Sequence, residues 1–73
     1  MLNPLTVMAM MLKMLYGKEV MLDTIGGQVF IGRVVDYFFP EDNEHGKESI
    51  VLKTKDNDHI ELTEETIEKI DIV

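Results

Sequence analysis

The chain has 73 residues, which is the size of one small domain, and it contains no cysteine, which excludes disulfide bonds and thiolate metal sites. Its formal net charge is −7, and the whole imbalance lies from Glu41 onward, where eleven acidic residues face four lysines. Because an acidic surface repels phosphate groups, this charge argues against nucleic acid and anionic lipid as partners.

One α-helix is predicted near the N-terminus, over residues 4–16. Asn3 is a favoured N-cap, Pro4 suits the first helical turn, and Gly17 is a typical C-terminal cap. The apolar run is shorter than the roughly 20 residues of a membrane-spanning helix, and it lacks the basic leader and cleavage site of a secretory signal. We therefore expect a cytoplasmic protein that does not associate with membranes.

The apolar surface of this predicted helix is wider than one domain can cover. Apolar positions extend over about 240° of the helix, whereas a surface helix needs little more than about 100°. We expect one side to cover the chain's own strands, through Met8, Leu12 and Leu15. Because methionine suits adaptable interfaces and a small domain gains from a partner, the other side predicts a homo-oligomer contact, formed by Val7, Met10 and Met14.

After the helix, apolar residues recur with a period of two, which predicts β-strands. Five strands are expected, over residues 19–24, 28–39, 49–55, 59–62 and 67–73, with a single helical turn at 63–66. Ile70 and Ile72 are expected to face the core from the last strand. Gly26 and Gly27 predict a tight turn between the first two strands, because glycine readily adopts a positive φ.

The second predicted strand is unusually long and contains Gly32. A glycine inside a strand marks a bend or a close approach of another backbone segment. A strand bent at this position can belong to both halves of a small barrel, and closing the barrel removes most of the exposed sheet edge. We therefore predict a single domain over residues 1–73 that is mostly β, with one N-terminal α-helix and a five-stranded, strongly bent antiparallel barrel over residues 18–73.

Known catalytic and metal-binding patterns are not matched by the sequence. In the acidic loop after Pro40, the alternating positions of Glu41, Asn43, His45 and Gly46 are similar to those of a calcium loop. Counted from Glu41, however, the twelfth position is Leu52, where a bidentate Glu is required. The only histidines, His45 and His59, fall short of a zinc-site spacing, and Ser49 lacks the flanking glycines of a nucleophile elbow. We therefore expect no enzymatic activity, no cofactor and no bound metal.

The first two predicted strands contain two spaced patterns, Val20-x-Leu22 and Gly27-x-x-Phe30-x-Gly32-x-Val34. The second pattern has a turn glycine, an inward aromatic residue and a bend glycine. Together with the predicted order of elements, this spacing resembles the first motif of the Sm/Lsm family of SH3-like small barrels. The resemblance implies a ring in which the fourth strand of one subunit pairs with the fifth strand of the next, and it implies binding of uridine-rich RNA.

The residues with which the family binds RNA are not matched here. Asp36 is followed by Tyr37-Phe38-Phe39 instead of the family's Asp-x-x-hydrophobic-Asn loop. Thr63-Glu64-Glu65-Thr66 stands where the family has Arg-Gly, so an anionic turn replaces a cationic RNA contact. Two hypotheses remain. We favour a non-enzymatic, self-associating small-barrel module; the alternative is an RNA-binding Sm-type ring with an atypical, acidic site.

Overall fold

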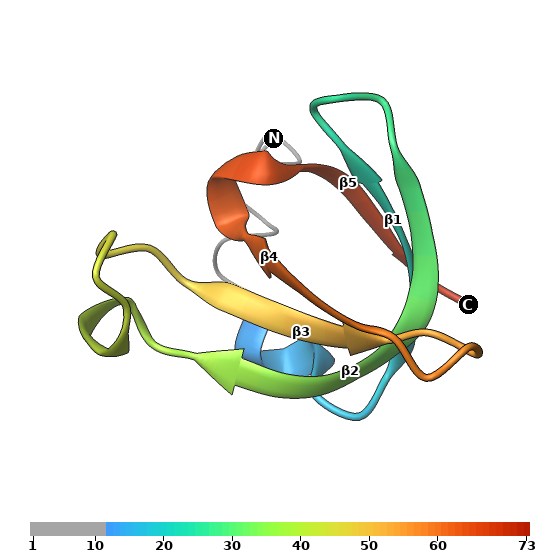
Figure 1. Cartoon of the computed structure of the whole chain (residues 1–73), viewed down its shortest axis with the longest axis horizontal. Coiled ribbons are helices and arrows are strands. Elements are labelled where there is room, and N and C mark those ends of the chain that lie inside the picture. The colour runs from blue at the N-terminus through green and yellow to red at the C-terminus, as the bar shows by residue number, and fades with distance from the viewer. Residues whose placement is uncertain (1–11) are drawn as a thin grey trace.

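The computed structural model describes residues 12–73, and this part of the chain is mostly β. A short 3-10 helix, η1, precedes the first strand, and two further 3-10 turns, η2 and η3, lie between later strands (Figure 1). The elements in chain order are η1 (Leu12–Leu15), β1 (Glu19–Thr24), β2 (Val29–Phe38), η2 (Pro40–Asp42), β3 (Ser49–Lys53), β4 (His59–Thr63), η3 (Glu64–Thr66) and β5 (Ile67–Ile72).

All five strands belong to one antiparallel sheet, in the order β4-β3-β2-β1-β5. The sheet is strongly curled, so that its two outer strands come round toward each other (Figure 1). β4 and β5 nevertheless remain the two edges of the sheet. The predicted five-stranded antiparallel sheet is therefore confirmed, whereas the predicted closed barrel is not, because no backbone ladder joins β4 to β5 within residues 12–73.

The long strand β2 serves both halves of the curled sheet. Its first half pairs with β1 and its second half pairs with β3. Arg33 lies at the junction, since it is opposite Glu19 of β1 and also opposite Lys53 of β3. A register shift between Val34 and Asp36 adds a bulge just beyond this point, and bulges increase the local bend and twist of a strand.

The core lies inside the curl, where alternate strand residues meet the apolar side of η1. Phe30 and Ile70 are only partly buried, but they pack against this cluster. Ile72, which the sequence pattern assigned to the core, is 60% exposed, because it stands at the very end of an edge strand. The buried members of the cluster are Leu12, Leu15, Val20, Leu22, Val34, Ile50, Leu52, Leu62 and Ile67.

The predicted N-terminal α-helix falls largely outside the described residues, which exclude residues 4–11. Leu12–Leu15 form a 3-10 helix instead of the last turn of an α-helix. Three residues per turn place Leu12 and Leu15 on one face, and both are buried as expected. Gly17 then turns the chain with a φ of 82°, and its N–H donates to the carbonyl of Val34 at 2.7 Å. This bond to β2 anchors η1 at the end of the core.

Within residues 12–73 we find no helix with the length and apolarity that a bilayer crossing requires.

Candidate functional site

The open edge of β4 offers unpaired backbone groups. The N–H of Thr54 donates to the carbonyl of Asp58 at 2.9 Å, which fixes the alternation of hydrogen bonds along the β3–β4 ladder. Because hydrogen-bonded and non-hydrogen-bonded pairs alternate in an antiparallel ladder, the N–H and C=O groups of His59 and Glu61 point away from β3. Among residues 12–73 no strand lies on that side of β4.

The direction of the backbone groups along β5 follows from one hydrogen bond to β1. The N–H of Val73 donates to the carbonyl of Glu19 at 3.0 Å, just beyond the last residue of β5. The same alternation therefore directs the backbone groups of Ile70 and Ile72 away from β1, toward the open side of the sheet. Exposed strand edges are ready templates for pairing with another chain. The sheet formed by residues 12–73 thus carries two such edges, one on each outer strand.

The candidate interface residues on the predicted helix divide into two groups. Val7 and Met10 lie outside the described residues. Met14 lies in η1, between the buried Leu12 and Leu15, and its side chain is 65% exposed. The same short element therefore buries two leucines in the core and leaves a large, flexible apolar side chain on the surface.

The two glycines singled out in the sequence both occupy positions that restrict side chains. Gly27 lies in the turn between β1 and β2 with a φ of 85°, and its N–H donates to the carbonyl of Thr24 at 3.0 Å. Gly32 lies where β2 passes from β1 to β3. A β-carbon built there would be 2.7 Å from the carbonyl oxygen of Lys53, so the backbone of β3 comes close to this position.

A tyrosine and a glutamate are joined by a hydrogen bond between β2 and the start of β3. The Tyr37 hydroxyl donates to Glu48 Oε1 at 2.6 Å. Burial of the phenol raises the pKa of Tyr37 above its ordinary value, and the hydrogen bond and the negative charge of Glu48 raise that pKa further. The second carboxylate oxygen of Glu48, Oε2, is buried without a hydrogen-bond partner in the described part of the chain.

Ser49 has a structural role beside this pair. The residue is fully buried, and its hydroxyl donates to Glu61 Oε2 at 2.8 Å. The Asn43 amide donates to Ser49 Oγ at 3.2 Å and to the carbonyl of Lys47 at 2.7 Å. Ser49 therefore ties the acidic loop to β4, and its burial leaves no access for a substrate. Within residues 12–73, no group of three or more His, Asp or Glu side chains is placed to hold a metal ion.

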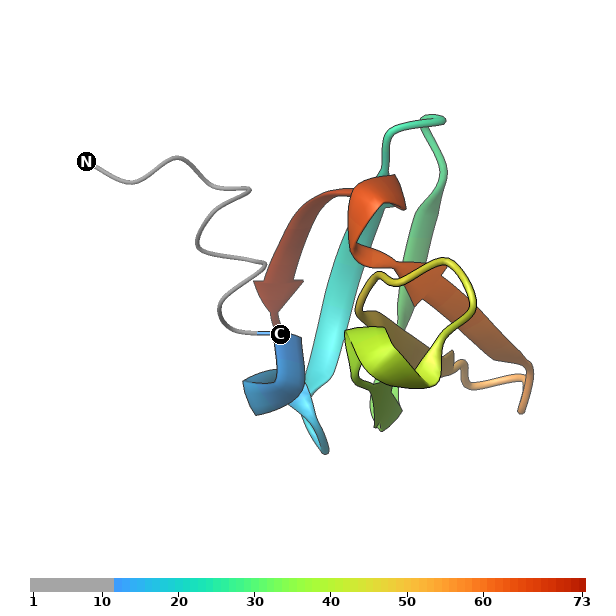
Figure 2. The ribbon, with the colours of Figure 1, turned by 90° about the vertical axis from the view of Figure 1, so that its left-hand side faces the viewer.

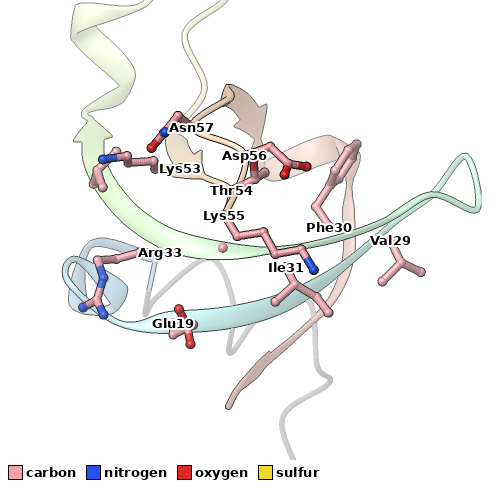
Figure 3. A pocket seen from close by; sticks show the side chains of 12 residues that line it. Glu19, Val29, Phe30, Ile31, Arg33, Lys53, Thr54, Lys55, Asp56 and Asn57 are labelled. Atoms are coloured by element: carbon pink, nitrogen blue, oxygen red, sulfur yellow. The ribbon is translucent and has the colours of Figure 1, made fainter.

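A groove of about 790 Å³ lies between β2 and the β3–β4 turn (Figure 3). Sequence reasoning missed it, because its residues come from three segments that only the curl of the sheet brings together. Alternation along β2 was the available signal, since Val29 and Ile31 both face outward. The lining residues are Glu19, Val29, Phe30, Ile31, Gly32, Arg33, Val35, Lys53, Thr54, Lys55, Asp56 and Asn57.

Comparisons of the chain with protein-family models, with curated proteins and with solved structures gave no match.

Proposed function

We propose that this protein is a non-enzymatic, self-associating small-barrel module of the Sm-like type, in which β4 of one copy pairs with β5 of the next. The single observation that carries the proposal is the pair of open edges at the two ends of one curled sheet. Pairing them between copies would satisfy the outward backbone groups of both strands. Such a contact is head-to-tail, so repeating it gives a ring when the rotation closes.

The Sm-like assignment is supported by the region around the bend of β2. Gly27 makes the turn before this strand, Phe30 packs against the core from it, and Gly32 permits the close approach of β3. These are the roles that the resemblance implies for the turn glycine, the inward aromatic residue and the bend glycine. In this proposal, contact between copies completes the barrel-like assembly that a single open sheet leaves unfinished.

Exposed apolar side chains give a second reason to propose self-association. Met14 projects from η1 and Ile72 from the end of β5, and each is at least three-fifths exposed. Burying a large apolar side chain contributes about 1.5–3 kcal/mol. We propose that Met14, together with Val7 and Met10, forms part of the contact between copies.

Two proline variants test the edge pairing, because proline removes a backbone donor. His59→Pro and Ile72→Pro each remove an N–H that points outward, at the first residue of β4 and the last residue of β5. Proline is tolerated at such edge positions. His59→Ala and Ile72→Ala are the matched controls, since they shorten the same side chains but keep the N–H groups. Circular dichroism establishes that each variant is folded.

At a salt concentration high enough to screen contacts between charged surfaces, we expect each proline variant alone to be monomeric, and each alanine control to associate more strongly than its proline counterpart. Mixed together, the two proline variants should form a one-to-one dimer and nothing larger, because only one intact β4 edge and one intact β5 edge can then meet. A dimer formed by either proline variant alone would show that like edges pair with each other. Proline variants with the mass of the wild-type assembly would refute edge pairing.

A further inference from the structure

The groove between β2 and the β3–β4 turn brings basic side chains together in an otherwise acidic protein. Its lining contains three of the chain's seven basic residues, Arg33, Lys53 and Lys55, against two carboxylates. Lys55 extends over the outer side of β2 near Ile31, while Arg33 and Lys53 stand toward one end of the groove (Figure 3). The groove therefore favours a ligand that carries negative charge.

The floor of the same groove is aliphatic. Val29 is 58% exposed and Ile31 is 56% exposed, although both lie in the middle of the sheet order on β2. Phe30, which lies between them, packs against the core and also lines the groove, whereas Val29 and Ile31 lie outside the core. A ligand that fits this groove combines an apolar group for the floor with acidic groups for the lysines.

The acidic loop after β2, residues 39–48, carries an exposed apolar ring beside acidic side chains. The Phe39 ring is 48% exposed and makes an edge-to-face contact with Tyr37, with ring centroids 5.0 Å apart. Glu41 and Asp42 follow in η2, and both are exposed. Asn43 holds the loop through its bonds to Lys47 and Ser49, as described above. Because the loop is already ordered, docking it elsewhere costs little conformational entropy.

This loop cannot reach the groove of its own chain. In Figure 1 the loop with η2 forms the left end of the molecule, while the β3–β4 turn that borders the groove lies at the right end, along a longest extent of 33 Å. Figure 2, which views the molecule from the loop end, shows the loop in front. A contact between the two surfaces must therefore join two molecules.

We infer that the groove binds the acidic loop of a second copy of this chain, with Phe39 seated on Val29 and Ile31, and with Glu41 and Asp42 facing Lys53 and Lys55. The groove lining contains no residue of β4 or β5, so the contact leaves the backbone edges of these two strands free for pairing. The inference rests on the proposed self-association and adds a second, charge-dependent surface to it.

A dilution series followed by methyl NMR tests this contact and separates it from edge pairing. The methyl signals of Val29 and Ile31 report on the groove, whereas those of Ile70 and Ile72 report on the β5 edge. In the wild type we expect the groove signals to shift with protein concentration. The midpoint of this shift is the protein concentration at which half of the change has occurred. Raising the salt concentration should move that midpoint to higher protein concentration, because exposed ion pairs are screened.

Charge reversal makes the test specific. Lys53→Glu with Lys55→Glu should raise the concentration midpoint of the groove signals by on the order of tenfold, the size expected for two exposed ion pairs. Adding Glu41→Lys and Asp42→Lys to the same chain should return the midpoint toward the wild-type value. Lys13→Glu with Lys18→Glu is the control, because it changes the net charge equally at residues outside the groove lining and outside both edge strands.

The possible results separate the two proposals. The groove contact would be refuted if the Val29 and Ile31 signals did not change on dilution. It would also be refuted if the chain that carries both sets of charge reversals did not regain the wild-type midpoint. If the Ile70 and Ile72 signals shift while the groove signals do not, edge pairing stands and the groove contact falls. If neither set shifts, both proposals fail.

Discussion

A β-carbon placed on Gly32 would lie 2.7 Å from the carbonyl oxygen of Lys53 and 3.1 Å from its carbonyl carbon. Both neighbours are backbone atoms, so no rotamer change can relieve the contact. The approach occurs where β2 passes from its pairing with β1 to its pairing with β3. The absence of one side chain thus lets the sheet curl over its own core.

We predict that Gly32→Ala destabilises the fold by about 1–3 kcal/mol, the usual cost of overpacking, and that Gly32→Val costs more. Gly26→Ala is the matched control, because a β-carbon there meets only Thr24 Oγ1, at an ordinary contact distance of 3.8 Å. Chemical denaturation measures both free energies of unfolding. Equal stabilities for the two alanine variants would refute the role assigned to Gly32.

At Gly27, in the turn between β1 and β2, the backbone conformation restricts the side chain. No atom outside the chain neighbours of Gly27 lies within 4 Å of a β-carbon built there, so space is not limiting. Its φ of 85° is strained for other L-residues. We expect Gly27→Ala to cost about 1–2 kcal/mol and Gly27→Asn to cost less, because asparagine tolerates this region. Thermal unfolding of the two variants checks the order, and an alanine variant as stable as the wild type would contradict it.

The local pattern of the sequence predicted all five strands and the tight turn at Gly26 and Gly27, because strand alternation and turn glycines act over a few residues. Other features depend on partners distant in sequence. Leu12–Leu15 form a 3-10 helix where the capping pattern predicted the last turn of an α-helix, and the Tyr37–Glu48 bond needs β2 and β3 to meet. The groove likewise exists only once the β3–β4 turn stands beside Val29 and Ile31. No short-range pattern encodes these contacts.

The raised pKa of Tyr37 predicts a loss of stability at alkaline pH. The folded state favours the neutral phenol, so its stabilising contribution is fully present below the unfolded pKa of about 10. Above that pH the unfolded chain releases the proton first, and the free energy of unfolding falls as pH rises toward the folded pKa. Urea denaturation across this pH range measures the decline.

Tyr37→Phe should remove much of this decline, because phenylalanine has no proton to release. Tyr16→Phe is the matched control, since it changes the only other tyrosine and keeps the bond to Glu48. In that variant, ultraviolet absorbance follows Tyr37 alone and should show its ionisation above the ordinary range. An ionisation near pH 10 in the folded protein would contradict the proposed burial and pairing of this phenol.

The acidic turn between β4 and β5 predicts weak RNA binding. Glu64 and Glu65 form most of η3, at the position where the resemblance implies a cationic RNA contact. Replacing them with Arg and Gly should increase the affinity for uridine-rich RNA, measured by fluorescence anisotropy at low salt. An adenine-rich oligomer serves as the control ligand. Tight binding by the wild type, unchanged by the exchange, would support the RNA-binding ring instead.

Sedimentation equilibrium of the full-length protein over a range of micromolar concentrations tests the central proposal most directly. We expect a folded assembly whose mass is an integer multiple of the 8.4 kDa chain. Met14→Glu should weaken the assembly, because it places a charge on the exposed side of η1. A wild type that sediments as a single 8.4 kDa species at every concentration would contradict self-association altogether.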